Sequence, residues 1–242
     1  MARSLENKTA LVIGASSGIG RATALALAKH QARVVLVARR QSILDELATR
    51  CGPLASAYAC DITDDGKIKQ LVAKLKADFA QIDILVHSAG VIKIGKTEDS
   101  SVKDFDAQFA ANVRGPYLLT QFLLPSLRSA SGHIVLVNSS ITRASSTDGR
   151  GAFAATQHAL RSIANTLRDE VNGAGVKVTT VYPGTTDTQR QIELCAIAGK
   201  RYDSDRMLRP EDVAEAVLFT LTVGGSAEIT DLYLRPMLKP LS

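Results

Sequence analysis

The sequence predicts an α/β fold: one doubly wound, parallel, seven-stranded sheet with helices on both of its faces. Short apolar runs that suit strands alternate with stretches of helical period along the whole chain, and the turns between them are short. The apolar runs are continuous rather than alternating, which is typical of strands buried on both faces. Of the 242 residues, 45 % are apolar and 22 % are charged, as in an ordinary globular protein. We therefore expect one domain over residues 1–242.

Each expected element has its own signal in the sequence. The continuous apolar runs predict strands at residues 11–13, 34–37, 55–60, 82–88, 134–137, 176–182 and 229–234. The stretches between them predict helices at 21–29, 64–79, 100–129, 151–172 and 211–222. One more helix is predicted from the end of the second strand to about residue 50. In the helix at 64–79, for example, positions 68, 71, 72, 75 and 79 are apolar and fall on one face.

Two stretches are expected to be irregular. The helix at 100–129 should be interrupted near Gly115 and Pro116, because proline has no N–H for the helical hydrogen bond. Residues 184–208 show no clear period and are predicted to form an irregular lid or loop over a substrate.

The turn after the first strand has the sequence Gly14-Ala-Ser-Ser-Gly-Ile-Gly20 and leads into a helix. Gly14 permits a sharp exit from the strand. Glycines at 18 and 20 let the backbone approach a ligand and let the helix start tight against the sheet. The unpaired N–H groups of the first helical turn carry the positive end of the helix dipole, so a pyrophosphate is their natural partner. Between a buried strand and a long helix, this turn predicts a dinucleotide site.

Composition narrows the class of protein further. The chain has an odd number of cysteines, Cys51, Cys60 and Cys195, and none of them belongs to a C-x-x-C pair. This indicates reduced thiols in the cytoplasm and no metal site. The first residues lack an apolar signal segment, and no stretch approaches the ~18 apolar residues of a membrane span. The net charge of +5 is spread along the chain, which favours an anionic cofactor over nucleic acid. A cytoplasmic protein without membrane or nucleic-acid partners is expected.

Six motifs follow one another along the chain: Gly14-Ala-Ser-Ser-Gly-Ile-Gly20, Asp61 in Cys-Asp-Ile-Thr, Ala89-Gly90 in His-Ser-Ala-Gly, Asn112 in Asn-Val-Arg-Gly, Ser139-Ser140 after the fifth strand, and Pro183-Gly184 with Thr188. In this order and at these spacings they resemble those of the short-chain dehydrogenase/reductase family, the single-domain Rossmann family of NAD(P)-dependent oxidoreductases. The resemblance covers essentially the whole chain. It implies a ligand at the carboxyl ends of the strands. The residues it implies for cofactor binding, together with two arginines considered next, are Gly14, Ser16, Ser17, Gly18, Ile19, Gly20, Arg39, Arg40, Asp61, Ile62, Ser88, Ala89, Gly90, Gln157, Pro183, Gly184 and Thr188.

The end of the second strand distinguishes between the two nicotinamide cofactors. Roughly 20 positions past the glycines, dinucleotide folds place an acidic residue for a ribose 2′-hydroxyl, whereas arginine suits a 2′-phosphate. This chain has Ala38-Arg39-Arg40 there. A guanidinium binds phosphate with paired hydrogen bonds, and no carboxylate is present to repel it. NADP(H) is expected; the alternative is that both arginines are merely solvated.

The active-site motif departs from the family. The resemblance implies a relay of Asn, Ser, Tyr and Lys, in which Tyr transfers the substrate proton and Lys lowers the Tyr pKa. Asn112 and Ser140 match the first two residues. Thirteen residues after Ser140, however, the Tyr-x-x-x-Lys segment is Phe153-Ala-Ala-Thr-Gln157. Phenylalanine has no proton to give and glutamine no charge to stabilise a phenolate, although Gln157 can still hydrogen-bond ribose hydroxyls.

Three nearby side chains are weak candidates to replace the lost acid. His158 lies about 100° around the helix from Gln157 and is expected to face away from the site. Tyr182 is expected to pack within its strand, and His87 to have a structural role.

Three functions are therefore open. The first is an NADP(H)-dependent oxidoreductase that transfers hydride to a small molecule needing no proton from tyrosine, such as an iminium ion or an enone protonated elsewhere. The second is a cofactor-binding sensor or partner-stabilising module without turnover. The third is non-redox catalysis, with Ser140 polarising a carbonyl. Retention of Ser140 and Asn112 favours catalysis.

The resemblance also implies assembly into a homodimer or homotetramer. The helices expected at 100–129 and 151–172 correspond to those that pair between subunits in many family members. Small residues on the second helix permit close approach: Ala152, Ala155, Ala159 and Ala164. The alternative is that these alanines only pack on the sheet.

Overall fold

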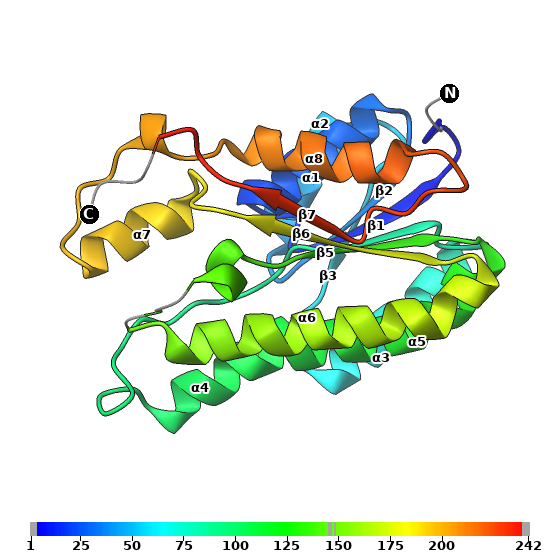
Figure 1. Cartoon of the computed structure of the whole chain (residues 1–242). Coiled ribbons are helices and arrows are strands. Elements are labelled where there is room, and N and C mark those ends of the chain that lie inside the picture. The colour runs from blue at the N-terminus through cyan, green and yellow to red at the C-terminus, as the bar shows by residue number, and fades with distance from the viewer. Residues whose placement is uncertain (1–3, 145–146, 148, 239–242) are drawn as a thin grey trace.

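A parallel sheet with the strand order β3-β2-β1-β4-β5-β6-β7 runs through the centre of the molecule (Figure 1). The computed structural model describes residues 4–144, 147 and 149–238. Within them the strands are β1 (Thr9–Ile13), β2 (Arg33–Ala38), β3 (Ser56–Ala59), β4 (Ile84–His87), β5 (His133–Val137), β6 (Lys177–Pro183) and β7 (Asp231–Leu234). The α-helices are α1 (Gly18–Lys29), α2 (Gln41–Cys51), α3 (Asp65–Asp78), α4 (Val102–Phe109), α5 (Gly115–Ser129), α6 (Gly151–Val171), α7 (Gln189–Ile197) and α8 (Pro210–Thr222). The predicted doubly wound, seven-stranded parallel sheet is confirmed.

The central strand β1 sets the position of the site. Leu11 of β1 pairs with Val35 of β2 on one side and with Leu85 of β4 on the other. The chain first builds outward to β3, returns to β4 beside β1, and then builds outward in the other direction. A reversal of this kind leaves a crevice at the carboxyl ends of the strands, where parallel sheets bind their ligands.

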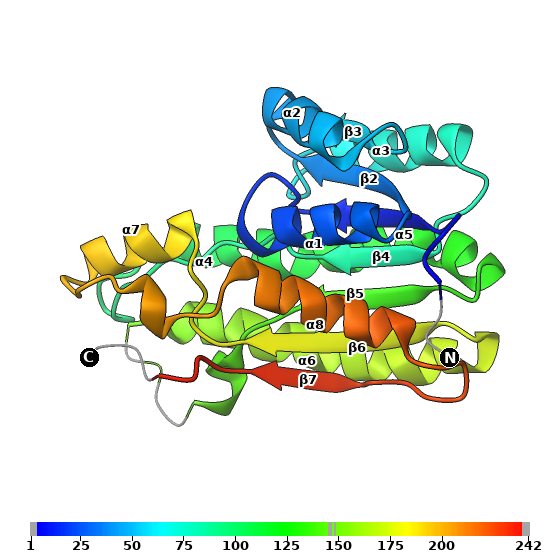
Figure 2. The same ribbon diagram turned by 90° about the horizontal axis from the view of Figure 1, so that it is seen from above.

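Helices cover both faces of the sheet in two separate layers. Figure 2 shows α1 and α8 side by side on one face, with α2 beyond α1. The other face carries α3, α4, α5 and α6 (Figure 1). This double covering explains why the central strands β1, β4 and β5 are continuous apolar runs, since helices bury both of their faces, whereas the edge strands β3 and β7 are only partly buried.

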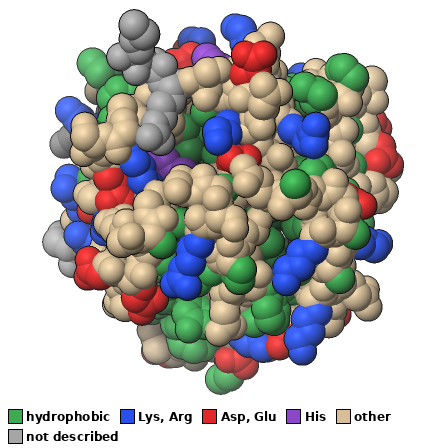
Figure 3. All heavy atoms as spheres, turned by 90° about the vertical axis from the view of Figure 1, so that its right-hand side faces the viewer, with side chains coloured by type: hydrophobic (Ala, Val, Ile, Leu, Met, Phe, Trp, Pro, Cys, Tyr) green, Lys and Arg blue, Asp and Glu red, His purple; other side chains and the backbone are tan. Residues whose placement is uncertain are grey.

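The face at the amino ends of the strands lies opposite the predicted site. There, basic and acidic side chains are interspersed with apolar and neutral ones (Figure 3). Among the helices of the described residues, none combines the length and the apolar character that crossing a lipid bilayer requires.

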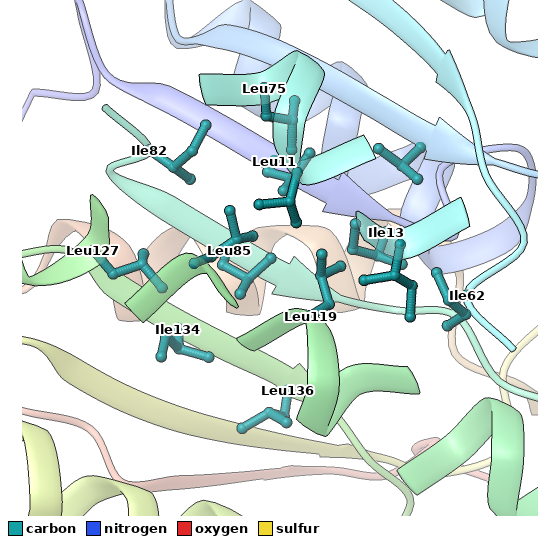
Figure 4. Packing of buried hydrophobic residues seen from close by; sticks show 14 of the residues in the cluster. Leu11, Ile13, Ile62, Leu75, Ile82, Leu85, Leu119, Leu127, Ile134 and Leu136 are labelled. Carbon is teal, nitrogen blue, oxygen red and sulfur yellow. The ribbon is translucent and has the colours of Figure 1, made fainter. Parts of the chain in front are cut away.

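Two hydrophobic cores hold the layers to the sheet. One core joins β1, β4 and β5 to α3 and α5, as the labelled side chains of Figure 4 show. Leu11 and Leu85 are fully buried there beneath Leu119 of α5. The second core lies under α1, α2 and α8. Burying one such leucine contributes about 1.5–3 kcal/mol, so these apolar faces stabilise the ends of the strands at which the site is built.

The predicted interruption of the long helix is a π-helical turn rather than a break. Residues Ala110–Arg114 form this turn between α4 and α5, and the Gly115 N–H donates to the carbonyl of Ala110. A Cβ on Gly115 would lie 2.4 Å from the Ile62 carbonyl oxygen, so only glycine fits there. Inserted turns of this kind occur often at functional sites. This one contains Asn112 and carries it to the site.

The prediction that residues 184–208 lack regular structure is wrong in part. They contain the helix α7 and a short 3₁₀ helix at Ser204–Arg206. Thr188 caps α7, its hydroxyl accepting a hydrogen bond from the Gln191 N–H (3.2 Å). The helix leaves Ile192 and Ile197 exposed and buries chiefly Cys195, so its sequence shows no apolar face. It extends beyond the carboxyl ends of the strands (Figure 1), where a lid was expected.

Candidate active site

A cavity of about 1540 Å³ opens where β1, β2, β4, β5 and β6 end. Nearly every residue predicted to bind cofactor lines it: Gly14, Ser16, Ser17, Gly18, Ile19, Arg39, Arg40, Asp61, Ile62, Ser88, Ala89, Gly90, Gln157, Pro183, Gly184 and Thr188. Asn112, Ser140 and Phe153 line it as well. The structure therefore brings together, in one cavity, residues that are up to 174 positions apart (14 to 188) in the sequence.

Gly20 is the exception, because it is buried and does not line the cavity. A Cβ at position 20 would lie 2.3 Å from the Gly14 carbonyl oxygen, so this glycine allows α1 to start against the end of β1. Gly14 itself has a φ of +86°, and a Cβ there would lie 2.6 Å from the Ala89 nitrogen. The two glycines therefore allow the turn to fit tightly between β1 and α1, and the N-terminus of α1, which suits a phosphate, lies at the cavity.

Arginines surround the end of the cavity at β2. Arg39 and Arg40 are exposed at the end of that strand and line the cavity together with Arg21 and Arg50. Arg21 also donates to the Ser16 carbonyl (2.7 Å), which braces the glycine turn. The sequence analysis did not single out Arg21 or Arg50. Their spacing in the sequence gives no sign that they converge.

Asp61, which was also predicted to bind cofactor, lines the cavity near Arg39. Partial burial opposes its ionisation, but hydrogen bonds from the Thr63 N–H (3.0 Å) and hydroxyl (2.8 Å) and the positive charge of Arg39 hold the pKa of Asp61 below its usual value. Asp61 is therefore a carboxylate at neutral pH, able to accept hydrogen bonds from a ligand.

Asn112 is fixed by three hydrogen bonds. Its amide nitrogen donates to the Val91 carbonyl (2.8 Å) and to the Thr156 hydroxyl (3.0 Å), and its amide oxygen accepts from the Val91 N–H (2.7 Å). The side chain is 2 % exposed. Asn112 thus joins the loop after β4 to α6, and its side chain has little freedom to do anything else.

Gln157 is held by the same hydroxyl. Its amide nitrogen donates to Thr156 Oγ1 (3.3 Å), and its backbone carbonyl accepts from Asn138 (3.0 Å). Thr156 is fully buried and donates in turn to the Phe153 carbonyl (2.7 Å). Sequence reasoning missed Thr156. A polar residue on the buried face of α6, next to Gln157, was the available signal.

Ser140 and Phe153 both lie on the lining of the cavity. Ser140 begins a 3₁₀ helix (Ser140–Arg143) after β5, and Phe153 lies in the first turn of α6; both are half-buried. In the part of the chain that the structure describes, the cavity lining contains neither tyrosine nor histidine. His158 is exposed, as expected, and Tyr182 is fully buried and stacked on Tyr233.

His87 has the structural role that was expected. It ends β4, is 2 % exposed, and its Nε2 lies 2.8 Å from the Thr120 hydroxyl. Its Nδ1 has no hydrogen-bond partner among the described residues. Burial lowers the pKa of His87 to about 3, so it stays neutral through the physiological range.

We expect the buried, neutral His87 to make the folded protein less stable in acid. The unfolded chain takes up a proton on this residue near pH 6.5 and the folded chain does not, so the stabilisation is complete above pH 6.5 and is lost as pH falls toward 3. We expect His87→Gln to reduce the loss of unfolding free energy between pH 7 and pH 4 by about 3 kcal/mol. Urea denaturation at both pH values measures this, with exposed His158→Gln as the control. Equal losses in wild type and His87→Gln would contradict it.

The segment over the cavity is tied down at two points. Arg190 of α7 donates to the Gly90 carbonyl (2.5 Å), across the cavity from its own helix. The Tyr202 hydroxyl donates to Asp187, and this bond raises the pKa of Tyr202 to about 12. Asp187 and Arg190 line the cavity, and neither was predicted. They belong to the stretch whose sequence shows no period, so no pattern indicated them.

A parallel sheet with a glycine turn at its switch point, and a serine and a buried asparagine in the same cavity, defines a nucleotide-binding Rossmann protein of the oxidoreductase class. The profile of the family described as short chain dehydrogenase matches residues 8–196. The chain belongs to this family.

Relatives and solved structures agree with that assignment. An uncharacterized oxidoreductase of Staphylococcus saprophyticus is 34 % identical over 238 residues, which cover 96 % of this chain and 99 % of the relative. One of Staphylococcus epidermidis is 31 % identical over 234 residues, with the same coverage.

Among solved structures, a 3-ketoacyl-(acyl-carrier-protein) reductase of Brucella melitensis complexed with NADH has a TM-score of 0.86 at 28 % identity, covering 96 % of this chain and 98 % of that chain. A closed form of serine dehydrogenase complexed with NADP⁺ has a TM-score of 0.85 at 26 % identity, covering 94 % of each chain. These two proteins bind different nicotinamide cofactors, so their likeness leaves the choice between NAD and NADP to the residues of this chain.

Proposed function

We propose that this protein is an NADP(H)-dependent oxidoreductase that transfers hydride to a small-molecule substrate without a proton from an active-site tyrosine. One observation carries the proposal. Ser140 and Asn112 share a cavity with all of the residues predicted to bind cofactor except Gly20, while Phe153 stands at the position of the acid and the described lining holds no tyrosine or histidine. An iminium substrate fits such a site, because hydride alone neutralises it.

The cofactor fits the residues present. The turn from Gly14 to Gly20 leads into a helix N-terminus, which suits a pyrophosphate, and Arg39 and Arg40 line the cavity at the end of β2, where arginine suits a 2′-phosphate. NADPH supplies a hydride when it is bound. The Gln157 amide can bind ribose hydroxyls, and the Ser140 hydroxyl can orient a polar substrate atom by donating a hydrogen bond. Neither group has to give up a proton to do so.

Cofactor choice gives the first test of the proposal. We expect NADPH to bind at least about tenfold more tightly than NADH, since a guanidinium–phosphate pair is a charge-assisted bond. Arg39→Ala should remove most of that difference and leave NADH binding unchanged. Calorimetric titration of both cofactors measures it. Arg33→Ala, at the exposed opposite end of β2, is the matched control. Equal affinities in the wild type would remove the basis for NADP(H).

Turnover distinguishes the proposed function from its alternatives. The protein is incubated with NADPH and a panel of ketones, imines and enones, and the loss of NADPH absorbance is followed. Oxidation with imines but not with simple ketones is expected. Binding of NADPH without oxidation on any substrate would favour a sensor or partner-stabilising module. Product formation without loss of NADPH would favour non-redox catalysis centred on Ser140.

We also propose assembly into a homodimer or homotetramer through α4, α5 and α6. Val102, Phe105 and Tyr117 expose 74 %, 42 % and 52 % of their surface on α4 and α5. On α6, Ala155 is exposed but Ala164 is fully buried, so Ala164 packs inside its own subunit.

Light scattering tests this assembly. We expect a dimer or tetramer at micromolar concentration, and a smaller mass for Tyr117→Glu, because a charge replaces an apolar contact. Phe219→Glu, on the exposed side of α8, controls for added charge alone. A wild-type monomer would contradict the proposal.

A further inference from the structure

Two loops meet at the outer end of the cavity. The Gly95 N–H donates to the Gly149 carbonyl (2.8 Å), which holds the loop after β4 against the residues that precede α6. Lys93 lies on the first loop and Arg150 is the N-cap residue of α6, directly after Gly149. Both line the cavity. Two cations from distant parts of the chain are thereby placed on adjoining walls.

A third cation reaches the same loop from the roof. Arg190 of α7 donates to the carbonyl of Gly90, where the loop after β4 begins, and lines the cavity. A single hydrogen bond to a neutral carbonyl leaves most of the five guanidinium donors available.

The cavity as a whole is lined by more basic than acidic side chains. Among the described residues, its seven cations are Arg21, Arg39, Arg40, Arg50, Lys93, Arg150 and Arg190, and its four carboxylates are Asp61, Asp106, Asp187 and Glu211. Lys93 lies 3.9 Å from Asp104, and Glu193 lies near Arg190, but neither Arg150 nor Arg190 forms a direct ion pair with a carboxylate of the described chain. The surplus of positive charge in a cleft attracts an anion and favours its binding.

Arg150 and Arg190 lie close to the reacting end of the site. Arg150 precedes Phe153 by one helical turn, on the same side of α6. Gly90, to which Arg190 is bonded, adjoins Asn112: a Cβ on Gly90 would lie 3.1 Å from the Asn112 side-chain oxygen. An anionic group held by these arginines would share the cavity with a substrate atom placed at Ser140.

We propose that Arg150 and Arg190 bind a carboxylate of the substrate, with Lys93 adding charge at the rim. The substrate class is then small oxo- or imino-carboxylic acids whose carboxylate lies a few bonds from the reacting carbon. This inference rests on the proposed function for the identity of the reacting end. The planar fork of arginine matches a carboxylate with two parallel hydrogen bonds, which makes the arginines the principal contacts.

Matched acids and esters test the inference by binding. Protein saturated with NADPH is titrated by calorimetry with pyruvate and 4-oxopentanoate, with their methyl esters, and with methyl phosphate. We expect the acids to bind at least about tenfold more tightly than the esters. Arg150→Gln and Arg190→Gln should each remove most of this preference. Arg128→Gln, an exposed arginine on α5 that does not line the cavity, should keep it.

The remaining outcomes separate this inference from the proposed function. Equal binding of acid and ester, or a preference that survives both cavity substitutions, overturns the inference. Tighter binding of methyl phosphate than of either acid overturns the assignment to carboxylates. If NADPH does not bind, the proposed function fails. The acids are then titrated into cofactor-free protein, where a preference lost in Arg150→Gln supports the anion site and its absence overturns it.

Discussion

Restoring both missing side chains, Phe153→Tyr together with Gln157→Lys, is expected to raise NADPH-dependent reduction of simple activated ketones by about 10²–10⁴ over the parent. The tyrosine adds one hydroxyl to a side chain of nearly the same shape, at a cavity that already holds Ser140 and Asn112. The lysine supplies the charge that makes that hydroxyl a usable acid. The loss of NADPH absorbance under saturating ketone measures the gain.

The single variants are the internal controls. A tyrosine with an unshifted pKa of ~10 is a poor proton donor near neutrality, so Phe153→Tyr alone should gain little. The double variant should exceed the product of the two single effects, because the side chains act as a unit. Phe219→Tyr, on the exposed side of α8, adds a hydroxyl away from the site and should change nothing.

Two results would contradict this interpretation of the site. Ketone reduction by the parent at about 1 to 10³ per second would mean that another group or an ordered water already supplies the proton. A double variant that binds NADPH and stays inert on every ketone would mean that the pocket itself has diverged. The second result would favour the sensor or partner-stabilising module.

Gly20→Ala is expected to lower the free energy of unfolding by about 3 kcal/mol or more. Its new Cβ would lie 2.3 Å from the Gly14 carbonyl oxygen, so the start of α1 would have to move away from β1. Urea denaturation gives the free energy. Gly173→Ala is the matched control, since a Cβ there meets nothing within 4 Å. A loss at position 20 within about 0.5 kcal/mol of the control would show that the helix start can shift freely.

The strands and most of the residues that line the cavity could be predicted because they rest on local signals. Runs such as 134–137 are apolar without interruption, and the turn from Gly14 to Gly20 is compact in sequence. The strand order β3-β2-β1-β4 then places the predicted residues at one edge of the sheet. A pattern in the sequence was sufficient wherever neighbours in the chain determine the structure.

The rest depends on contacts between distant segments. Thr156 is important because Asn112, 44 positions away, donates to it, and no local pattern marks that contact. Arg190 reaches Gly90, 100 positions away, from a helix whose apolar residues face outward. The π-helical turn at Ala110–Arg114 likewise follows from the close packing of Gly115 on Ile62, which the sequence around Pro116 indicated only as an irregularity.

The burial of Gln157 against the Thr156 hydroxyl determines which of the two substitutions, Phe153→Tyr or Gln157→Lys, the fold tolerates first. Gln157 is 5 % exposed and donates to that hydroxyl, so a lysine arriving first would bury a charge with no phenolate to stabilise it. A tyrosine arriving first adds only a hydroxyl at the half-buried position 153. The accessible path therefore passes through Phe153→Tyr, and urea denaturation should show a smaller loss of unfolding free energy for Phe153→Tyr than for Gln157→Lys.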